Sequence, residues 1–256
     1  MGSRPTHSAR PAARSPGSYA TAPGDGADFQ NGLVVDGRRR IVVSGSSDLG
    51  PAGGGGRWRL QRFTPDGAVD RSFGHRGTVL TQMSGVGGDD EHLWRIALQP
   101  DGKIVAVGYA VTATGGEDFA LARYLPDGRL DPSFGTGGRV FTALAPGAGD
   151  DEAQAVQVLG NGRIVVAGFA GTGADSSGRD LALARYLPDG RLDPSFGSGG
   201  LVVRDVAGGR DQFKAMTLDR RGRIVAVGSA DLGAGAGGTS FAVARYRADG
   251  RPDAFG

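Results

Sequence analysis

The sequence predicts an all-β fold made of four copies of one unit of about 60 residues, and three observations support this prediction. First, an apolar run that ends in glycine recurs four times, with offsets of 63, 60 and 60 between its leading isoleucines, which are Ile41, Ile104, Ile164 and Ile224. Second, 48 of the 256 residues are glycine and 13 are proline, so the apolar runs are short and separated by turn residues. Third, these runs have the length and the β-branched composition of strands rather than of helices.

The first two strands of each unit, A and B, are predicted to form a hairpin. In the second unit, Ile96 and Leu98 lie at alternate positions of strand A, and the recurring run 104–108 is strand B. Between them lies Asp101-Gly102, a pair that permits the positive φ angles of a two-residue turn. We therefore expect strands A and B to pair antiparallel in each copy.

A third and a fourth strand, C and D, follow in each unit. Strand C leads into a Pro-Asp-Gly or Ala-Asp-Gly turn, and an acidic corner with phenylalanine and glycine comes next. The expected C strands are 58–63, 119–124, 181–186 and 241–246, and the expected D strands are 77–81, 138–142 and 200–204. Four antiparallel strands in a unit of this size make one blade of a β-propeller.

The fourth unit stops before any D strand, and the missing strand has a counterpart at the other end of the chain. Residues 17–21 share the pattern of the D strands. We therefore expect Ser18 to Thr21 to pair beside the strand around Ala244, which closes a ring of four four-stranded antiparallel blades. Closure of the ring would remove exposed sheet edges.

The predicted domain organisation is a tail followed by one folded domain. Residues 1–16 carry three arginines and no acid, and we expect them to be a disordered basic tail without the apolar segment of a signal peptide. Residues 17–256 are expected to form a single β-propeller domain, with repeat units at about 22–81, 82–142, 143–204 and 205–256.

Composition narrows the classes of function. The net charge is +2 and no basic stripe is present, so we expect no nucleic-acid partner. The chain has no cysteine, which excludes disulfides and thiolate metal sites. The sequence contains no run of 18 apolar residues, so we expect no membrane-spanning helix. The three histidines share no repeat position and no catalytic motif stands in its required context, so we expect no enzyme and no required cofactor.

The repeated motifs resemble a known family. Ala-Arg-Tyr, Pro-Asp-Gly and Asp-Pro-Ser-Phe-Gly recur in the second and third copies, and together these stretches resemble the delta-60 repeat family of bacterial β-propellers over about residues 17–256. The first copy departs from the pattern, with Arg71 and Gln61 where the better copies have proline and alanine. The resemblance implies a propeller fold and an extracellular or envelope setting. It implies no activity, because the family has no assigned catalytic residues to transfer.

One arginine of strand C and one acid of the corner recur in every copy. A charged ligand site is one interpretation, but an identical pair in each unit is typical of an architectural part of a repeat protein. We therefore predict four structural ion pairs, Arg62 with Asp70, Arg123 with Asp131, Arg185 with Asp193, and Arg245 with Asp253.

A second set of acids precedes each leading isoleucine by thirteen residues: Asp28, Glu91, Asp151 and Asp211. If strand A is innermost, these acids would ring one mouth of a central channel, and their mutual repulsion would favour a bound cation such as Ca²⁺. The alternative is that each acid caps its own loop by accepting backbone N–H bonds.

The leading functional hypothesis is a non-catalytic binding scaffold. The B–C loops differ most between copies and lie on the same face as the D–A loops, so we expect a protein or a glycan to bind there. One alternative is a cation-dependent enzyme or cation-binding module that uses the acidic ring. We expect a monomer, and the remaining alternative is a half-ring that pairs with a second copy into a larger propeller.

Overall fold

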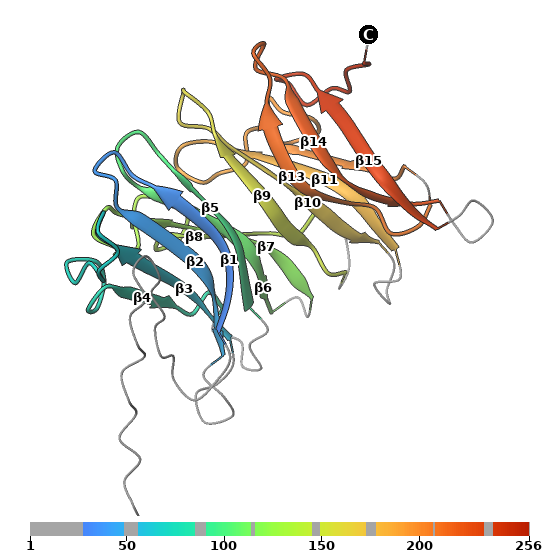
Figure 1. Ribbon diagram of the computed structural model, residues 1–256. Coiled ribbons are helices and arrows are strands. Elements are labelled where there is room, and N and C mark those ends of the chain that lie inside the picture. The colour runs from blue at the N-terminus through green and yellow to red at the C-terminus, as the bar shows by residue number, and fades with distance from the viewer. Residues whose placement is uncertain are drawn as a thin grey trace, which may run out of the picture.

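The computed structural model describes residues 28–48, 56–84, 91–113, 116–144, 149–172, 178–206, 208–232 and 238–255 (Figure 1). These residues form strands and turns only, which confirms the predicted all-β class. No helix that could cross a membrane occurs among these residues.

The strands form four separate antiparallel sheets, one for each predicted unit. Within each sheet the strands are paired in chain order, so every sheet is a meander. The first sheet contains β1 (Asp28–Val35), β2 (Ile41–Asp48), β3 (Gly56–Phe63) and β4 (Thr78–Thr81). The second contains β5 (Glu91–Leu98), β6 (Ile104–Val111), β7 (Glu117–Tyr124) and β8 (Arg139–Thr142). The third contains β9 (Glu152–Val158), β10 (Ile164–Thr172), β11 (Gly178–Tyr186) and β12 (Leu201–Arg204). The fourth contains β13 (Gln212–Leu218), β14 (Ile224–Asp231) and β15 (Thr239–Tyr246).

The hairpin between the first two strands of each sheet depends on a residue with positive φ. Glycine fills this position in three sheets, with φ of 82° at Gly102, 80° at Gly162 and 71° at Gly222. Glycine adopts this conformation without a steric penalty. In the first sheet the position is occupied by Arg39, with φ of 62°. The turn thus has the same geometry in all four units, although the first unit lacks the expected glycine.

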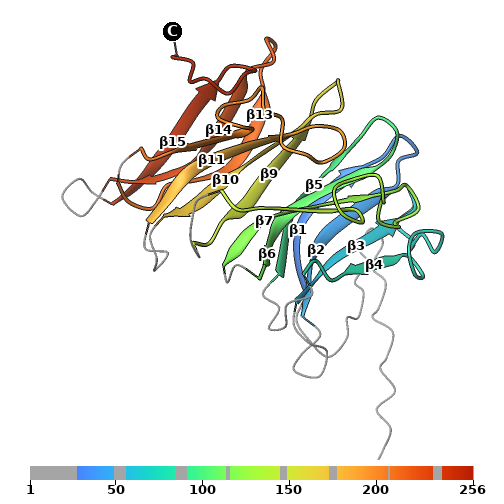
Figure 2. The same ribbon diagram turned by 180° about the vertical axis from the view of Figure 1, so that it is seen from behind.

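The four sheets are arranged side by side in a propeller-like array (Figure 1). The first strand of each sheet contacts the first strand of the next, so β1, β5, β9 and β13 form the inner row of the array. Both views place the first and fourth sheets at opposite ends of the array (Figure 2). The predicted closing strand, 17–21, lies outside the described residues, and closure of the ring stays a prediction. The proposed limits of the tail and of the repeat units likewise stay predictions.

Three hydrophobic cores lie between successive sheets. Between the first and second sheets, Trp58, Leu60 and Phe73 pack with Leu93 and Ile96. Equivalent clusters fill the spaces between the second and third sheets and between the third and fourth. The second and third sheets therefore each use one face to pack on the preceding sheet and the other to pack on the following one.

Candidate functional site

The arginine of strand C meets the acid of the corner in every sheet. The arginine Nε lies 2.8 Å from the aspartate Oδ2 in the Arg62–Asp70 and Arg123–Asp131 pairs, and 2.9 Å in the Arg185–Asp193 and Arg245–Asp253 pairs. The guanidinium of Arg123 also stacks over the ring of Phe134, 4.6 Å from its centroid. Each pair is thus part of the packed corner of its own sheet.

The same arginines tie each corner to the next sheet. Arg62 Nη1 donates to the carbonyl oxygen of Pro126 at 2.6 Å, and Arg123 Nη1 donates to the carbonyl of Pro188. Arg185 makes the equivalent bond to the carbonyl of Ala248. Since these acceptors lie in the Pro-Asp-Gly or Ala-Asp-Gly turn of the following unit, the arginines join neighbouring sheets, which is a structural role.

A second basic residue, which the sequence reasoning missed, approaches each corner acid. Nitrogen–oxygen distances are 3.6 Å for Arg40–Asp70, 3.3 Å for Lys103–Asp131, 2.7 Å for Arg163–Asp193 and 3.0 Å for Arg223–Asp253. Burial raises the pKa of Asp131, but hydrogen bonds from Ser133 and Lys103 and the charge of Arg123 outweigh it, so this pKa lies well below its usual range. The sequence did contain a signal for this second contact, because a basic residue stands directly before each leading isoleucine.

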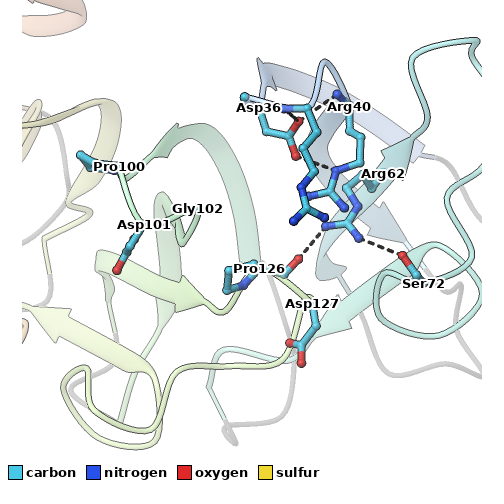
Figure 3. A pocket seen from close by; sticks show the side chains of 11 residues that line it. Asp36, Arg40, Arg62, Ser72, Pro100, Asp101, Gly102, Pro126 and Asp127 are labelled. Atoms are coloured by element: carbon cyan, nitrogen blue, oxygen red, sulfur yellow. Dashed lines mark hydrogen bonds and ion pairs between the residues drawn. The ribbon is translucent and has the colours of Figure 1, made fainter.

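A pocket of about 490 Å³ opens between the first and second sheets, where the hairpin turns and corners meet (Figure 3). Arg40 and Arg62 lie side by side in its wall, and Arg38 adds a third guanidinium. Arg62 donates to Pro126 and Ser72, and Arg40 pairs with Asp36 at 2.7 Å. Because Arg40 and Arg62 already bond within the protein, we interpret the pocket as part of the junction between two sheets.

Three of the four predicted cation ligands bind backbone amides instead. Glu91 accepts from the N–H groups of Met83 and Ser84, at 2.8 and 2.6 Å. Asp151 accepts from Leu144 at 2.7 Å and Gly171 at 2.9 Å.

Asp211 accepts in the same way from Val206 at 2.8 Å and Asp231 at 3.1 Å. The side chain of Asp28 lies outside the part of the chain that the structure describes. Within that part, no group of three or more histidine, aspartate or glutamate side chains is placed to hold a metal ion. The three described acids are therefore arranged as the loop caps of the alternative interpretation, and the Ca²⁺ ring stays a prediction.

Burial has a strong effect on one of these caps. It raises the pKa of Asp151 to about 6, although the two amides that donate to this carboxylate favour its charged form. The neighbouring acids Asp118 and Asp150 act in the same direction as burial. Asp151 is therefore a buried carboxyl that titrates unusually close to neutral pH.

The inner strands carry a feature that the repeat analysis did not anticipate, a β-bulge at the same position in all four sheets. The pairing with the second strand skips Asn31, Trp94, Gln154 and Lys214, a set called the bulge row below. The cause is the glycine that ends each recurring apolar run. A Cβ on Gly108 would lie 1.8 Å from the carbonyl oxygen of His92, so only glycine lets the bulged backbone approach this closely.

The bulge row and the residues two positions before it place aromatic, amide and charged groups along the inner strands. The His92 ring stacks on Trp94 with ring centroids 5.5 Å apart and on Tyr109 at 5.4 Å, and Phe29 lies 6.1 Å from His92. Phe29 is 52% exposed. An aromatic platform thus occupies the bulges of the first two sheets.

The third and fourth sheets continue this surface with charged and amide groups. Gln154 Nε2 donates to Glu152 Oε2 at 2.6 Å, and Arg179 Nη2 lies 4.0 Å from Glu152 Oε1. Burial raises the pKa of Glu152, opposed by the charges of Arg179 and Lys214. Burial also lowers the pKa of Lys214, opposed by Glu152. Glu152, whose pKa burial raises, therefore lies beside the bulge row and interacts with Trp94 of the aromatic platform.

The sequence contained a signal for the bulge row. The glycine is identical in the four copies, whereas the residues opposite it differ completely, with asparagine, tryptophan, glutamine and lysine at the bulge. Glycine inside a strand indicates a bulge or a close backbone approach. Variation on a constant backbone is typical of a binding surface.

Comparison with known families shows four matches to one repeat. The family described as "Domain of unknown function (DUF5122) beta-propeller" matches residues 39–73, 99–134, 159–196 and 222–255, which together exceed half of the chain. This supports the predicted bacterial-type β-propeller repeat. The delta-60 name and the extracellular or envelope setting stay predictions. No curated protein matches the chain in sequence.

Solved structures with similar folds are glycoside hydrolases by name. One is CoXyl43, a GH43 β-xylosidase/α-arabinofuranosidase from a compost microbial metagenome, with 11% identity, a TM-score of 0.47, and coverage of 88% of this chain and 76% of that one. Another is the GH43_1 enzyme from Xanthomonas citri complexed with xylose, with 15% identity, a TM-score of 0.43, and coverage of 90% and 73%. At this distance the likeness concerns the fold.

The expectation that this chain is not an enzyme is corrected by these structures. They are named as glycoside hydrolases, so absence of catalysis does not follow from the missing histidine and nucleophile motifs. That expectation rested on the missing histidine and nucleophile motifs, whereas carboxylates, which the alternative hypothesis of the acidic ring had kept open, suffice for glycoside cleavage.

Proposed function

This chain belongs to the DUF5122 β-propeller family, and we propose that it binds an oligosaccharide along the bulge row of its inner strands. The observation that carries the proposal is the aromatic platform of Phe29, His92 and Trp94, which continues into Glu152 and Lys214. Ligand sites characteristically combine apolar and aromatic walls with a few placed polar groups. A sugar ring presents both an apolar C–H face, which stacks on aromatic rings, and hydroxyls, which bond to carboxylates and amides.

The location of the row fits this function. Each bulge lies two or three residues after the start of its inner strand, at the end where the D–A loops enter. The second strand of each sheet runs antiparallel, so the B–C loops leave at the same end. The B–C loops and the bulge row, which differ most between the repeats, therefore lie at the same end of the array. A glycan that binds at this end would explain why both differ between copies.

Glycoside cleavage is a second candidate function, favoured by Glu152. Burial raises the pKa of this carboxyl, which is the change that a general acid needs in order to protonate a leaving-group oxygen. A second carboxylate would have to activate water or attack the sugar. Asp150 is the acid whose charge also raises the pKa of Glu152, and it is the candidate for that role.

One experiment tests both candidates. Wild type, Trp94→Ala and the control Phe141→Ala are titrated with the oligosaccharide that binds most tightly on a glycan array. Trp94→Ala should weaken binding at least about fivefold, because a stacking platform contributes on the order of 1 kcal/mol or more. Phe141 is exposed on the outer strand β8, and its loss should leave affinity unchanged.

Absence of wild-type binding to any sugar on the array, or equal affinities in all three proteins, contradicts glycan binding at the bulge row. Chromatography of the same mixtures detects cleavage. Products that form with the wild-type protein but not with Glu152→Gln favour hydrolysis. If the wild-type protein binds the sugar and leaves it intact, the function is binding without cleavage.

A further inference from the structure

The fourth sheet exposes a face that is buried in the sheets before it. In the second sheet, Phe119 and Leu121 are completely buried against the third sheet. Their counterparts on β15 are Phe241, which is 99% exposed, and Val243, which is 56% exposed. The sequence pattern is the same, so the difference arises because no described sheet follows the fourth one.

The first sheet exposes the opposite face. Ile96 of the second sheet is 8% exposed because it packs on the first sheet, and Met216 of the fourth is 9% exposed for the same reason. The counterpart of both on β1 is Leu33, which is 66% exposed, and the next inward position, occupied by Leu98 and Leu218 in the second and fourth sheets, is Val35, which is 56% exposed. The two ends of the array therefore carry the two unlike halves of one repeated packing interface.

The polar groups of the repeated junction are also divided between the first and the fourth sheets. At each of the three internal junctions, a corner glycine N–H donates at 2.8 Å to the aspartate carbonyl of the next turn, as Gly74 does to Asp127. A Cβ on Gly128 would touch Phe73 and Gly74 of the preceding corner, whereas one on Gly67 of the first turn would meet nothing within 4 Å. The first turn is thus a docking element whose matching corner is missing among the described residues.

The last corner is the matching element. Arg245 stacks over Phe255 with its guanidinium carbon 4.7 Å from the ring centroid, as the other corner arginines stack on their phenylalanines. The internal arginines each donate to the next turn, but Arg245 donates to Ala254 of its own corner. Phe255 is 58% exposed, whereas its three counterparts are fully buried. The last corner therefore offers a guanidinium donor and an exposed aromatic ring, the two groups that bind the next turn at the internal junctions.

We propose that a second copy of this chain docks head to tail, with the first sheet of one copy on the fourth sheet of the other. The contact continues the interface that the chain already uses three times: Leu33 and Val35 cover Phe241 and Val243, and Arg245 donates to the carbonyl of Pro65. A head-to-tail contact is heterologous and forms a ring when its rotation closes. Two copies of four sheets give eight blades, which lies within the usual range of propellers.

Sedimentation velocity of the full chain over a wide concentration range tests this proposal. Wild type should sediment at twice the monomer mass, whereas Phe241→Asp and Leu33→Asp should each be monomers, with association weakened at least about tenfold. Both side chains are exposed, so circular dichroism should show both variants folded. The control Phe141→Asp places a charge on another exposed aromatic residue and should keep the doubled mass.

Mixing the two variants provides the discriminating result. Phe241→Asp retains an intact first sheet and Leu33→Asp an intact fourth sheet, so an equimolar mixture should restore one junction and form a mixed dimer. A wild-type monomer at every concentration, a dimer that survives either substitution, or a mixture that stays monomeric overturns the proposal. The sugar titration is independent of this outcome, because the bulge row lies on different residues.

Discussion

The middle sheets and the end sheets have nearly the same sequence but different surroundings. The second and third sheets bury both faces, and Phe134 and Phe196 of their corners are fully buried. The fourth sheet repeats the motif, yet its Phe255 is 58% exposed. In a repeat protein each unit contacts only its neighbours, so stability is a sum of units and junctions. The same repeated residue is therefore buried only where a neighbouring sheet packs on it, so each junction needs residues from two adjacent sheets.

The largest difference is expected for the corner phenylalanines. Phe134→Ala should lower the free energy of unfolding by about 3–5 kcal/mol, because it empties a packed site between two sheets. Phe255→Ala should cost less than about 1 kcal/mol, since that ring is already largely in solvent. Urea denaturation of both variants in the Phe241→Asp background, which keeps the two ends free, measures the difference. Similar losses of unfolding free energy at the two positions would show that the last corner is packed as tightly as the internal ones.

A smaller effect should appear at the hairpin turn of the first sheet. Arg39 has positive φ where the other three turns have glycine, and this conformation strains a residue with a Cβ. Arg39→Gly should raise the free energy of unfolding by up to about 1 kcal/mol, less the greater freedom of glycine in the unfolded chain. Arg38→Gly is the matched control, because Arg38 is exposed and lies outside the positive-φ region. Thermal melts in which Arg39→Gly stabilises no more than the control would show that the turn holds no strain.

The fold was predictable because its pattern is local and repeated. The recurring run that starts at Ile104 marks a strand, and Gly102 before it marks the turn, so sheets and pairing followed from short-range rules. The partner of Arg123 was predictable for the same reason, since a repeated arginine and a repeated acid imply a repeated contact. Its second contact, to the Pro188 carbonyl, depends on how two sheets dock, which residue spacing alone does not determine.

The candidate site was harder to predict because it depends on the backbone. Trp94 and Lys214 occupy the same position of the repeat but belong to no repeated motif, and only the backbone shows that this position is bulged opposite a recurring glycine such as Gly108. Conversely, Asp151 is equivalent in every copy and suggested a cation ring, but the backbone amides of Leu144 and Gly171 satisfy its charge. Residues that are identical in all copies thus have structural roles, whereas the residues that differ between copies mark the proposed binding surface.

The most direct test of the account is the free energy of unfolding of four single variants, in which each corner arginine is replaced by alanine in the Phe241→Asp background. Arg62, Arg123 and Arg185 each join two sheets, so their loss should cost about 3 kcal/mol or more, because it breaks a buried ion pair and leaves the carbonyl of the next turn without its donor. Arg245 joins no second sheet among the described residues, and its ion pair with Asp253 is more exposed than the internal pairs, so its loss should cost about 1 kcal/mol. Equal losses at all four positions would contradict the claim that these arginines stabilise the junctions between sheets.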